Sequence, residues 1–159
     1  MSDVLLSPHF WLSEFTSSQV AMRRGIYNIP NGPDVAELRR VAAALELVRE
    51  ACGNRPISIS SGYRCSDLNK AVGGAYGSAH MLGRAADFTV PGLTPLQVCQ
   101  LVAPHADEFG IDQLIYEGTW VHLGLAAAGR DGRAQVLTAK FSRGGVRYSP
   151  GLPAGVGEA

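Results

Sequence analysis

The sequence lacks any run approaching the ~20 consecutive apolar residues that a membrane-spanning helix needs. It also lacks an excess of either charge, because Lys and Arg together number 14, as do Asp and Glu. A neutral balance favours neither nucleic acid nor an acidic membrane surface as a partner. The first residues, MSDVLLSPHFWL, show no basic region ahead of an apolar core and no small-residue cleavage site. We therefore expect synthesis in the cytoplasm without a signal peptide, and no integral membrane association.

Cysteine is scarce as well. The three residues Cys52, Cys65 and Cys99 are odd in number and irregularly spaced. Such a set is typical of a chain made in a reducing compartment and does not make a disulfide framework. Pairing of Cys52 with Cys65 after export stays open, because spacing alone does not establish a bridge.

The length of 159 residues is close to the commonest domain size. A chain of about 150 residues can bury roughly two-thirds of its unfolded surface. We expect one monomeric domain over residues 1–148, with residues 1–33 lying across its core as an irregular flap. Residues 149–159 are rich in Pro, Gly and Ala without a pattern, which predicts a flexible tail.

Hydrophobic periodicity predicts both helices and strands. A core-facing helix should start at an Asp34 N-cap and end at Gly53, and a second helix should start at a Thr94 N-cap. Strands are expected at 56–60, 86–90, 113–117 and 120–125, with an edge strand at 135–141. These elements predict an α+β domain in which a small, mostly antiparallel sheet carries the site on one face and helices on the other.

The segment 78–87, SAHMLGRAAD, has the composition of a metal site when it is taken together with His122. His80 and Asp87 lie seven positions apart with Gly83 and two alanines between them, so both side chains can face one ion. Zinc takes nitrogen and oxygen ligands at about 2.0–2.2 Å, and a catalytic zinc site keeps one position open for water. For an isolated pair, a loop histidine and a turn or cap aspartate would be the more ordinary roles.

The surrounding residues favour the metal site. SSGYR at 60–64, Asn69, GGAYGSAHMLGRAADF at 73–88 and WVHL at 120–123 together resemble the zinc peptidases of the D-alanyl-D-alanine carboxypeptidase family. That family also contains vancomycin-resistance dipeptidases and phage L-alanyl-D-glutamate endolysins. Its pattern, SxHxxGxAxD followed by a histidine in a late strand, is matched by the following residues: Ser78, His80, Gly83, Ala85, Asp87 and His122.

The resemblance covers roughly residues 10–125, and residues 10–30 are similar to the lead-in of the phage-type members. It implies a fold of the hedgehog and D-Ala-D-Ala-peptidase type. It also implies one zinc ion held by His80, Asp87 and His122.

Three further residues are expected to line the substrate site. Arg64 leaves a strand end with a planar, five-donor guanidinium suited to a bidentate carboxylate pair. The resemblance implies that Arg64 grips a substrate carboxylate or a backbone group beside the scissile bond; the alternative is a surface arginine in a salt bridge. Ser78 either hydrogen-bonds a substrate peptide group or steadies the site, and the resemblance favours the first. Tyr63 is expected beside the substrate as a core aromatic, in preference to a catalytic acid.

The catalytic base is predicted from a hairpin. Two strand-like runs are separated by the two residues 118–119, which is hairpin spacing. In that register Ile115 pairs with His122 and Glu117 pairs with Trp120, so Glu117 and His122 project from the same face. Diagonal neighbours across strands lie about 7–8 Å apart, which allows one to bind metal while the other reaches water. Glu117 is therefore the predicted base.

The resembling family often carries its acidic residue three positions before the last histidine, where this chain has Thr119. Three explanations stay open at this point. Glu117 substitutes through the hairpin, Asp112 supplies the carboxylate, or the activity is reduced.

Together these residues predict zinc-dependent hydrolysis of a peptide bond. The resemblance implies a peptidoglycan stem peptide as the substrate, and so action on the bacterial cell wall. The phage-like N-terminal segment and the missing signal favour an endolysin-type L-Ala-D-Glu endopeptidase over a D-Ala-D-Ala carboxypeptidase. The alternative from a different class is a non-catalytic, zinc-stabilised module, such as a phage structural or wall-binding component.

Overall fold

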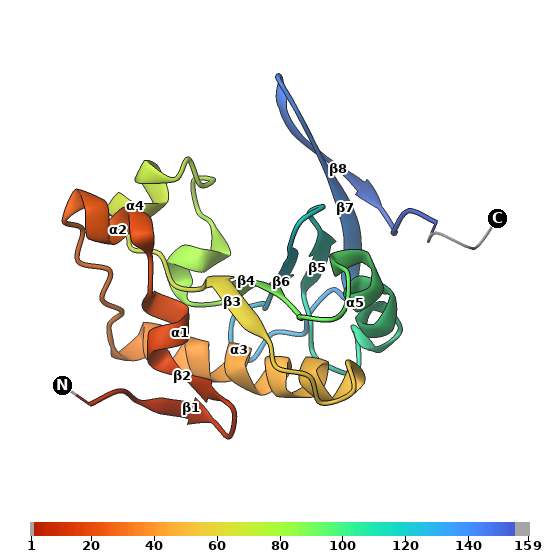
Figure 1. Ribbon diagram of the computed structural model, residues 1–159, viewed down its shortest axis with the longest axis horizontal. Coiled ribbons are helices and arrows are strands. Elements are labelled where there is room, and N and C mark those ends of the chain that lie inside the picture. The colour runs from red at the N-terminus through yellow and green to blue at the C-terminus, as the bar shows by residue number, and fades with distance from the viewer. Residues whose placement is uncertain (1, 155–159) are drawn as a thin grey trace.

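A 20-residue helix, α3 (Gly32–Ala51), lies along one face of a six-stranded sheet in the computed structural model, which describes residues 2–154 (Figure 1). Its first turn is closed by a capping box, in which the Asn31 side chain accepts from the Asp34 N–H and the Asp34 carboxylate accepts from the Asn31 N–H. The prediction of Asp34 as the N-cap is therefore wrong, because Asn31 takes that place and Pro33 fits the first turn. The prediction that this helix faces the core is confirmed by five side chains with 0% exposure: Leu38, Val41, Ala42, Leu45 and Val48.

The sheet has the strand order β3-β4-β6-β5-β7-β8 and is antiparallel except between β5 and β7. This confirms the predicted α+β class with a mostly antiparallel sheet. The strands are β3 (Ser58–Ser61), β4 (Ala85–Thr89), β5 (Gln113–Tyr116), β6 (Val121–Gly124), β7 (Gln135–Ser142) and β8 (Gly145–Pro150). The expected edge strand at 135–141 is β7, which is an inner strand because β8 pairs along its outer side.

Helix α5 (Pro95–Val102) packs beside α3, and its predicted Thr94 cap is confirmed by the Thr94 Oγ1 that accepts from the Gln97 N–H. The 3₁₀ turn η2 (Ala103–His105) follows it. Along the chain, helix α4 (Ser66–Ala71) and the 3₁₀ turn η1 (Ala79–Leu82) connect β3 to β4. None of the helices within residues 2–154 combines the length and the apolar character needed to cross a membrane.

The N-terminal segment consists of four short elements, β1 (Leu5–Ser7), β2 (Phe10–Trp11), α1 (Leu12–Thr16) and α2 (Gln19–Arg24). These elements replace the irregular conformation expected for residues 1–33, and within them Phe10 and Phe15 are 1% and 0% exposed in the core. The Tyr63 N–H donates to the Phe15 carbonyl at 2.7 Å. A Cβ on Gly62 would lie 2.6 Å from that carbonyl oxygen, so only glycine permits this approach. The N-terminal segment thereby fixes the strand end that leads to Arg64.

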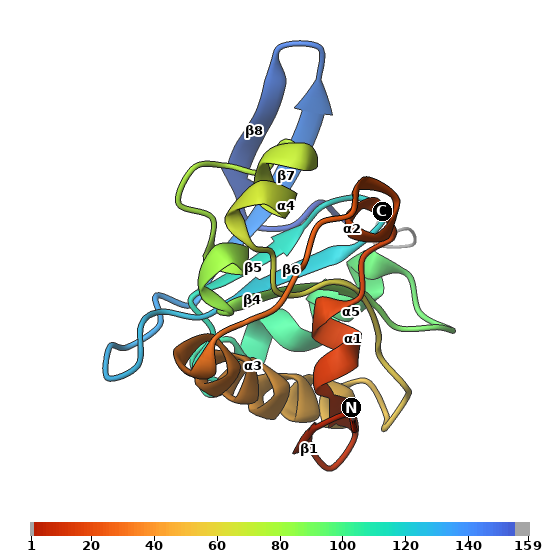
Figure 2. The same ribbon diagram turned by 90° about the vertical axis from the view of Figure 1, so that its left-hand side faces the viewer.

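The end of the chain differs in part from the expected tail. Strand β8 includes Ser149 and Pro150, and Leu152 packs against the core. Residues 155–159 lie outside the described part of the chain. Strands β7 and β8 continue together past the rest of the sheet as a hairpin that rises on the side away from α3 (Figure 2). Cys52, Cys65 and Cys99 are all free thiols.

Candidate metal centre

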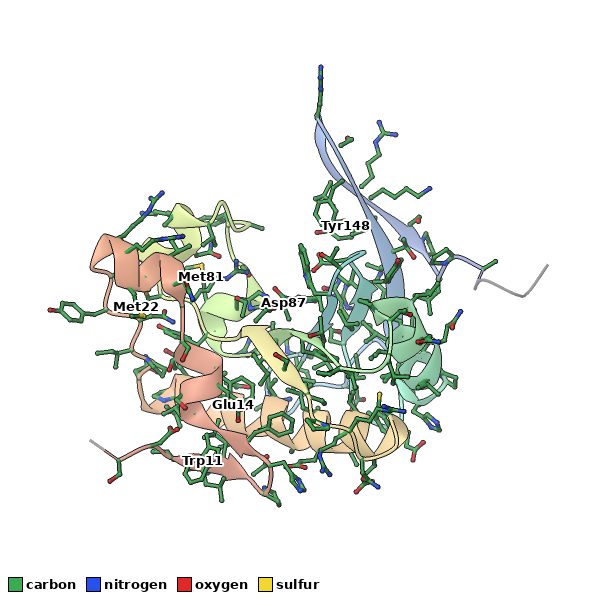
Figure 3. All side chains as sticks on the ribbon, viewed as in Figure 1. Trp11, Glu14, Met22, Met81, Asp87 and Tyr148 are labelled. Atoms are coloured by element: carbon green, nitrogen blue, oxygen red, sulfur yellow. The ribbon has the colours of Figure 1, made fainter. Side chains whose placement is uncertain are left out.

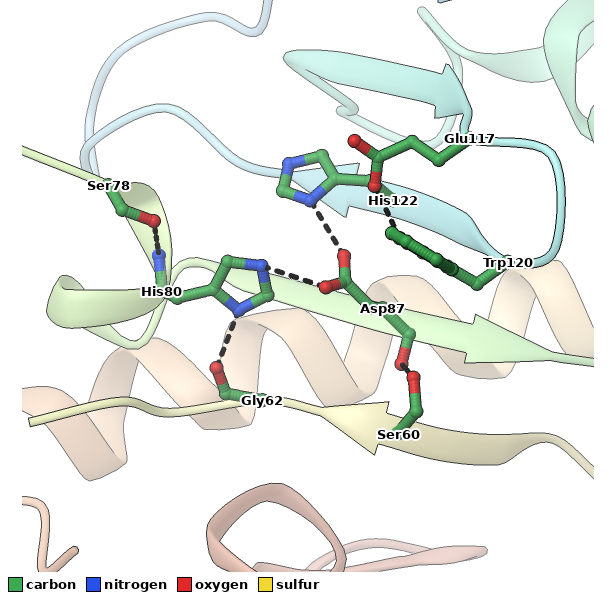
Figure 4. Close-up of polar contacts among 8 residues, drawn as sticks. All are labelled: Ser60, Gly62, Ser78, His80, Asp87, Glu117, Trp120 and His122. Atoms are coloured by element: carbon green, nitrogen blue, oxygen red, sulfur yellow. Dashed lines mark hydrogen bonds and ion pairs between the residues drawn. The ribbon is translucent and has the colours of Figure 1, made fainter. Parts of the chain in front are cut away.

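The three predicted ligands meet at the middle of the sheet. Asp87 on β4 lies directly opposite His122 on β6. His80 comes from η1, which ends at Gly83 in a left-handed conformation with φ 73°. A Cβ on Gly83 would lie 2.6 Å from the Asp34 carbonyl oxygen, so glycine is needed where this turn packs on α3. One ligand atom from each of His80, Asp87 and His122 lies within 4.8 Å of the others (Figure 4).

The hydrogen bonding of His80 fixes how its ring faces the cluster. Its Nδ1 lies 2.7 Å from the Gly62 carbonyl oxygen, which can only accept, so Nδ1 carries the proton. In the neutral ring, Nε2 then presents a lone pair to Asp87 Oδ2 at 3.4 Å. Two ligands held about 2.1 Å from a tetrahedral ion lie about 3.4 Å apart. His80 and Asp87 are thus spaced as ligands of one ion, with Gly62 orienting the imidazole.

Asp87 is the ionised member of the cluster. Its Oδ1 lies 2.9 Å from His122 Nδ1. Burial alone would raise the pKa of Asp87, but hydrogen bonds and charge from His122 and His80 hold that pKa well below its ordinary value. Gly124 leaves room for the His122 ring, because a Cβ there would lie 3.3 Å from Nε2. Two imidazoles and one carboxylate form a donor set that suits zinc.

Glu117 faces this cluster from the end of β5. The predicted register is confirmed, because Ile115 pairs with His122 and the Glu117 N–H donates to the Trp120 carbonyl at 3.1 Å. Glu117 and His122 project from the same face of the sheet (Figure 4). Burial raises the pKa of Glu117 and the Asp87 charge adds to this rise, although His122, the Trp120 hydrogen bond and Arg64 partly oppose it. A carboxylate with raised proton affinity beside a metal centre has the character of a general base.

Trp120 also belongs to the site, although the sequence did not predict a functional role for it. Its indole Nε1–H donates to Glu117 Oε2 across the hairpin turn. Its ring also lies against Phe141, with the ring centroids 6.0 Å apart. The predicted hairpin register could have indicated this role, because it already placed Trp120 opposite Glu117.

Asp112, the alternative base, lies at the opposite end of β5. Its two carboxylate oxygens accept from Arg133 Nε and Nη2, both at 2.9 Å. The Arg133 hydrogen bond lowers the pKa of Asp112. Asp112 therefore belongs to a surface ion pair and does not share the cluster.

Arg64 lies beside the cluster with its charge only partly balanced. Its backbone N–H donates to the His80 carbonyl at 3.0 Å. Its buried Nε has no hydrogen-bond partner among residues 2–154. Burial lowers the pKa of Arg64, while the negative charges of Asp87 and Glu117 oppose that change. Arg64, Tyr63 and Asp87 line a cavity of about 500 Å³ next to the cluster. The guanidinium is therefore placed where a bound ligand can reach it.

Ser78 and Tyr63 have structural contacts in addition to their predicted roles. The Ser78 Oγ accepts from the His80 N–H at 3.2 Å and so caps the turn that carries the histidine. The Tyr63 ring is buried at 8% exposure, as expected for a core aromatic. Figure 3 shows the position of Asp87 near the middle of the molecule, between α4 and the β7–β8 hairpin.

A carboxylate and two imidazoles around one point, with a second carboxylate facing them, define the centre of a metal-dependent hydrolase. Residues 8–124 match the family model of peptidase M15, and the chain belongs to this family. The family resemblance drawn from the sequence is confirmed.

The chain is also similar to the zinc D-Ala-D-Ala carboxypeptidase of Streptomyces albus G, with 37% identity over 92 residues. The match covers 56% of this chain and 34% of that protein. The chain thus spans about a third of the length of that relative.

Proposed function

We propose that this protein is a zinc peptidase that hydrolyses a peptide bond in peptidoglycan stem peptides. The convergence of His80 Nε2, Asp87 and His122 around one point, with Glu117 facing it, carries this proposal. Membership of the M15 family supports peptide hydrolysis. The name of the Streptomyces relative supports both zinc and D-alanine-containing peptides.

When held by His80, Asp87 and His122, a zinc ion supplies a Lewis acid that polarises the scissile carbonyl and lowers the pKa of water. Glu117 takes the proton from the attacking water and delivers it to the leaving amine. The raised pKa of Glu117 suits both steps, and the Trp120 N–H holds one carboxylate oxygen in place. Asp87 stays ionised throughout, since its pKa is held low.

Arg64 binds a carboxylate or a backbone carbonyl of the substrate in the cavity that it shares with Tyr63. Ser78 steadies the His80 turn, and in the proposed complex its hydroxyl also donates to a substrate peptide group. The enzyme is proposed to act as a monomer on the bacterial cell wall.

For the bond that is cut, we propose L-Ala-D-Glu. The supporting observation is that residues 10–30 are similar to the lead-in of phage-type endolysins. A second candidate, D-Ala-D-Ala cleavage, is supported by the name of the Streptomyces relative.

The test is digestion of purified cell-wall fragments by the zinc-loaded protein, followed by mass spectrometry of the products. A new amino terminus on D-Glu supports the endopeptidase, whereas release of free D-Ala supports the carboxypeptidase. The Glu117→Gln protein is the matched control and should release neither. If the parent releases neither product, the enzymatic proposal is wrong, and the non-catalytic zinc module replaces it.

A further inference from the structure

The β7–β8 hairpin lies outside residues 8–124, which match the family. Its strands pair continuously from Leu137 and Pro150 to the tip at Ser142 and Gly145. The hairpin rises from the same side of the sheet as the metal cluster, facing α4 across the site (Figures 1 and 3). None of the functional residues discussed above comes from it.

The strand register shows which face of the hairpin continues the site. His122 pairs with Ile115, and Ile115 pairs with Leu137. Two residues further along β7, Ala139 pairs with Tyr148. Paired residues share a face of a sheet, and residues two apart in a strand point to the same side. Tyr148 therefore lies on the face that carries the metal ligands.

This face of the hairpin is apolar but uncovered. Phe141 pairs with Val146 on it, and Tyr148 follows two residues later. Their exposures are 58%, 40% and 52%. Exposed apolar side chains gathered on one face commonly mark a binding surface. We call Phe141, Val146 and Tyr148 the hairpin face.

The opposite side of the same hairpin has a different character. There Lys140 pairs with Arg147, and both side chains are exposed. A charged outer side is an ordinary way to keep an exposed hairpin soluble. The apolar residues are thus confined to the side that continues the catalytic face.

The hairpin face lies close to Glu117, the proposed base. Tyr116 pairs with Thr138, so the next residue, Glu117, comes level with Ala139 and its partner Tyr148. Neighbouring strands are about 4.8 Å apart, which puts the backbones of Glu117 and Tyr148 about 10 Å apart. An extended peptide advances about 3.4 Å per residue, so this distance corresponds to roughly three substrate residues.

One contact agrees with this placement. Phe141 packs against Trp120, whose indole N–H donates to the Glu117 carboxylate. Burial raises the pKa of Tyr148, and the negative charges of Glu117 and Asp87 add to this rise.

We propose that the hairpin face is a wall of the substrate site that binds the peptide up to about three residues from the bond that is cut. The apolar rings contact small side chains of the peptide, and the Tyr148 hydroxyl donates to its backbone. This inference rests on the proposed peptidase function, because the occupant is the peptide substrate itself. Such remote contacts act on the ground state and the transition state alike, so their loss raises KM and leaves kcat almost unchanged.

The experiment compares two neighbours in β8 that lie on opposite sides of the hairpin. Tyr148→Ser and Arg147→Ser are each loaded with zinc and assayed with a soluble stem pentapeptide. We expect Tyr148→Ser to raise KM about tenfold, with kcat within about twofold of the parent. Arg147→Ser should leave both constants unchanged. Tyr148→Phe keeps the ring, so its KM should lie between those of the parent and Tyr148→Ser.

A shortened peptide that keeps only the residues flanking the cut bond makes the test independent of folding. With this peptide the parent and Tyr148→Ser should have equal KM values, because the distal contact is missing for both. A Tyr148→Ser protein that matches the parent on the pentapeptide overturns the proposal for the hairpin face while the peptidase function stands. An equal loss on both peptides also overturns it, because a distal contact cannot act on the short one. If the parent cuts neither peptide, the peptidase function and the hairpin inference fall together.

Discussion

The two ends of β5 carry carboxylates in opposite circumstances. Asp112 precedes the strand and is bound by both nitrogens of the Arg133 fork, which lowers its pKa. Glu117 follows the strand, faces Asp87 and His122, and has a raised pKa because it is buried. Four residues of strand thus separate a carboxylate that is kept ionised from one that keeps its affinity for a proton. The surroundings of a carboxyl group therefore identify the base better than the number of residues that separate it from the last histidine in the sequence.

The largest effect is expected when the cluster facing Glu117 is dismantled. His122→Ala removes one of three proposed ligands and leaves Asp87 without its closest nitrogen partner. We expect the protein to lose most of its bound zinc and all detectable hydrolysis, as measured by elemental analysis and product release. Asp112→Asn is the control, and it should retain parental zinc. Near-stoichiometric zinc in His122→Ala would refute this ligand set.

Replacing the Glu117 carboxylate tests whether Glu117, and not Asp112, is the base. Glu117→Gln preserves size and the hydrogen bond from Trp120 but cannot accept a proton near neutral pH. We expect kcat to fall about 10²–10⁴-fold with unaltered zinc content, since a positioned general base contributes that much.

Asp112→Asn, assayed beside it, should retain the parental rate, because Asp112 lies at the far end of the strand. The opposite outcome, activity lost with Asp112→Asn and kept with Glu117→Gln, would make Asp112 the base in spite of its ion pair.

Features that depend on residues close together in the chain could be predicted from the sequence. The spacing of 118–119 was enough to give the hairpin register, because a two-residue turn fixes which residues pair. The ligand pattern at His80 and Asp87 was recognised through its resemblance to a family, and the fold brings the turn that carries His80 next to the strand that carries Asp87.

Other features depend on contacts that local patterns do not encode. Strand β8 was missed because the alternation of Val146 and Tyr148 with Arg147 and Ser149 is short, and both sides of the strand are exposed. The proton position on His80 depends on the Gly62 carbonyl, 18 residues earlier. The cap at Asn31 was misplaced to Asp34 because both residues take part in one capping box.

Arg64 offers a second contrast with the Asp112 end of β5, where Arg133 is held in a two-point ion pair. The Arg64 Nε is buried without a hydrogen-bond partner among the described residues, whereas Arg133 binds its aspartate through two nitrogens. Arg64→Lys keeps the charge but loses the planar fork, so we expect kcat/KM to fall about tenfold. The matched variant Arg133→Lys should leave kcat/KM unchanged. Parental hydrolysis by Arg64→Lys at low substrate, with unchanged thermal stability, would exclude the carboxylate-binding role.

The smallest effect concerns stability at the Asp112 end. Because the folded-state pKa of Asp112 is lowered, its pairing with Arg133 stabilises the fold above the unfolded carboxyl pKa of about 3.9 and is lost as pH falls through the lower folded value. We expect Asp112→Asn to melt slightly below the parent at pH 7, with the difference in Tm vanishing in strong acid. Thermal unfolding followed by circular dichroism measures this. A difference in Tm that grows toward acid pH would contradict the assignment.

We propose above that His80, Asp87 and His122 hold one metal ion and that Glu117, not Asp112, faces it. A crystal structure of the zinc-loaded protein with anomalous diffraction at the zinc absorption edge tests this most directly. We expect one strong anomalous peak bonded to His80 Nε2, an Asp87 oxygen and His122 Nδ1, with the Glu117 carboxylate facing it. A peak at any other set of residues, or a fully loaded protein without a peak at these three, would contradict it.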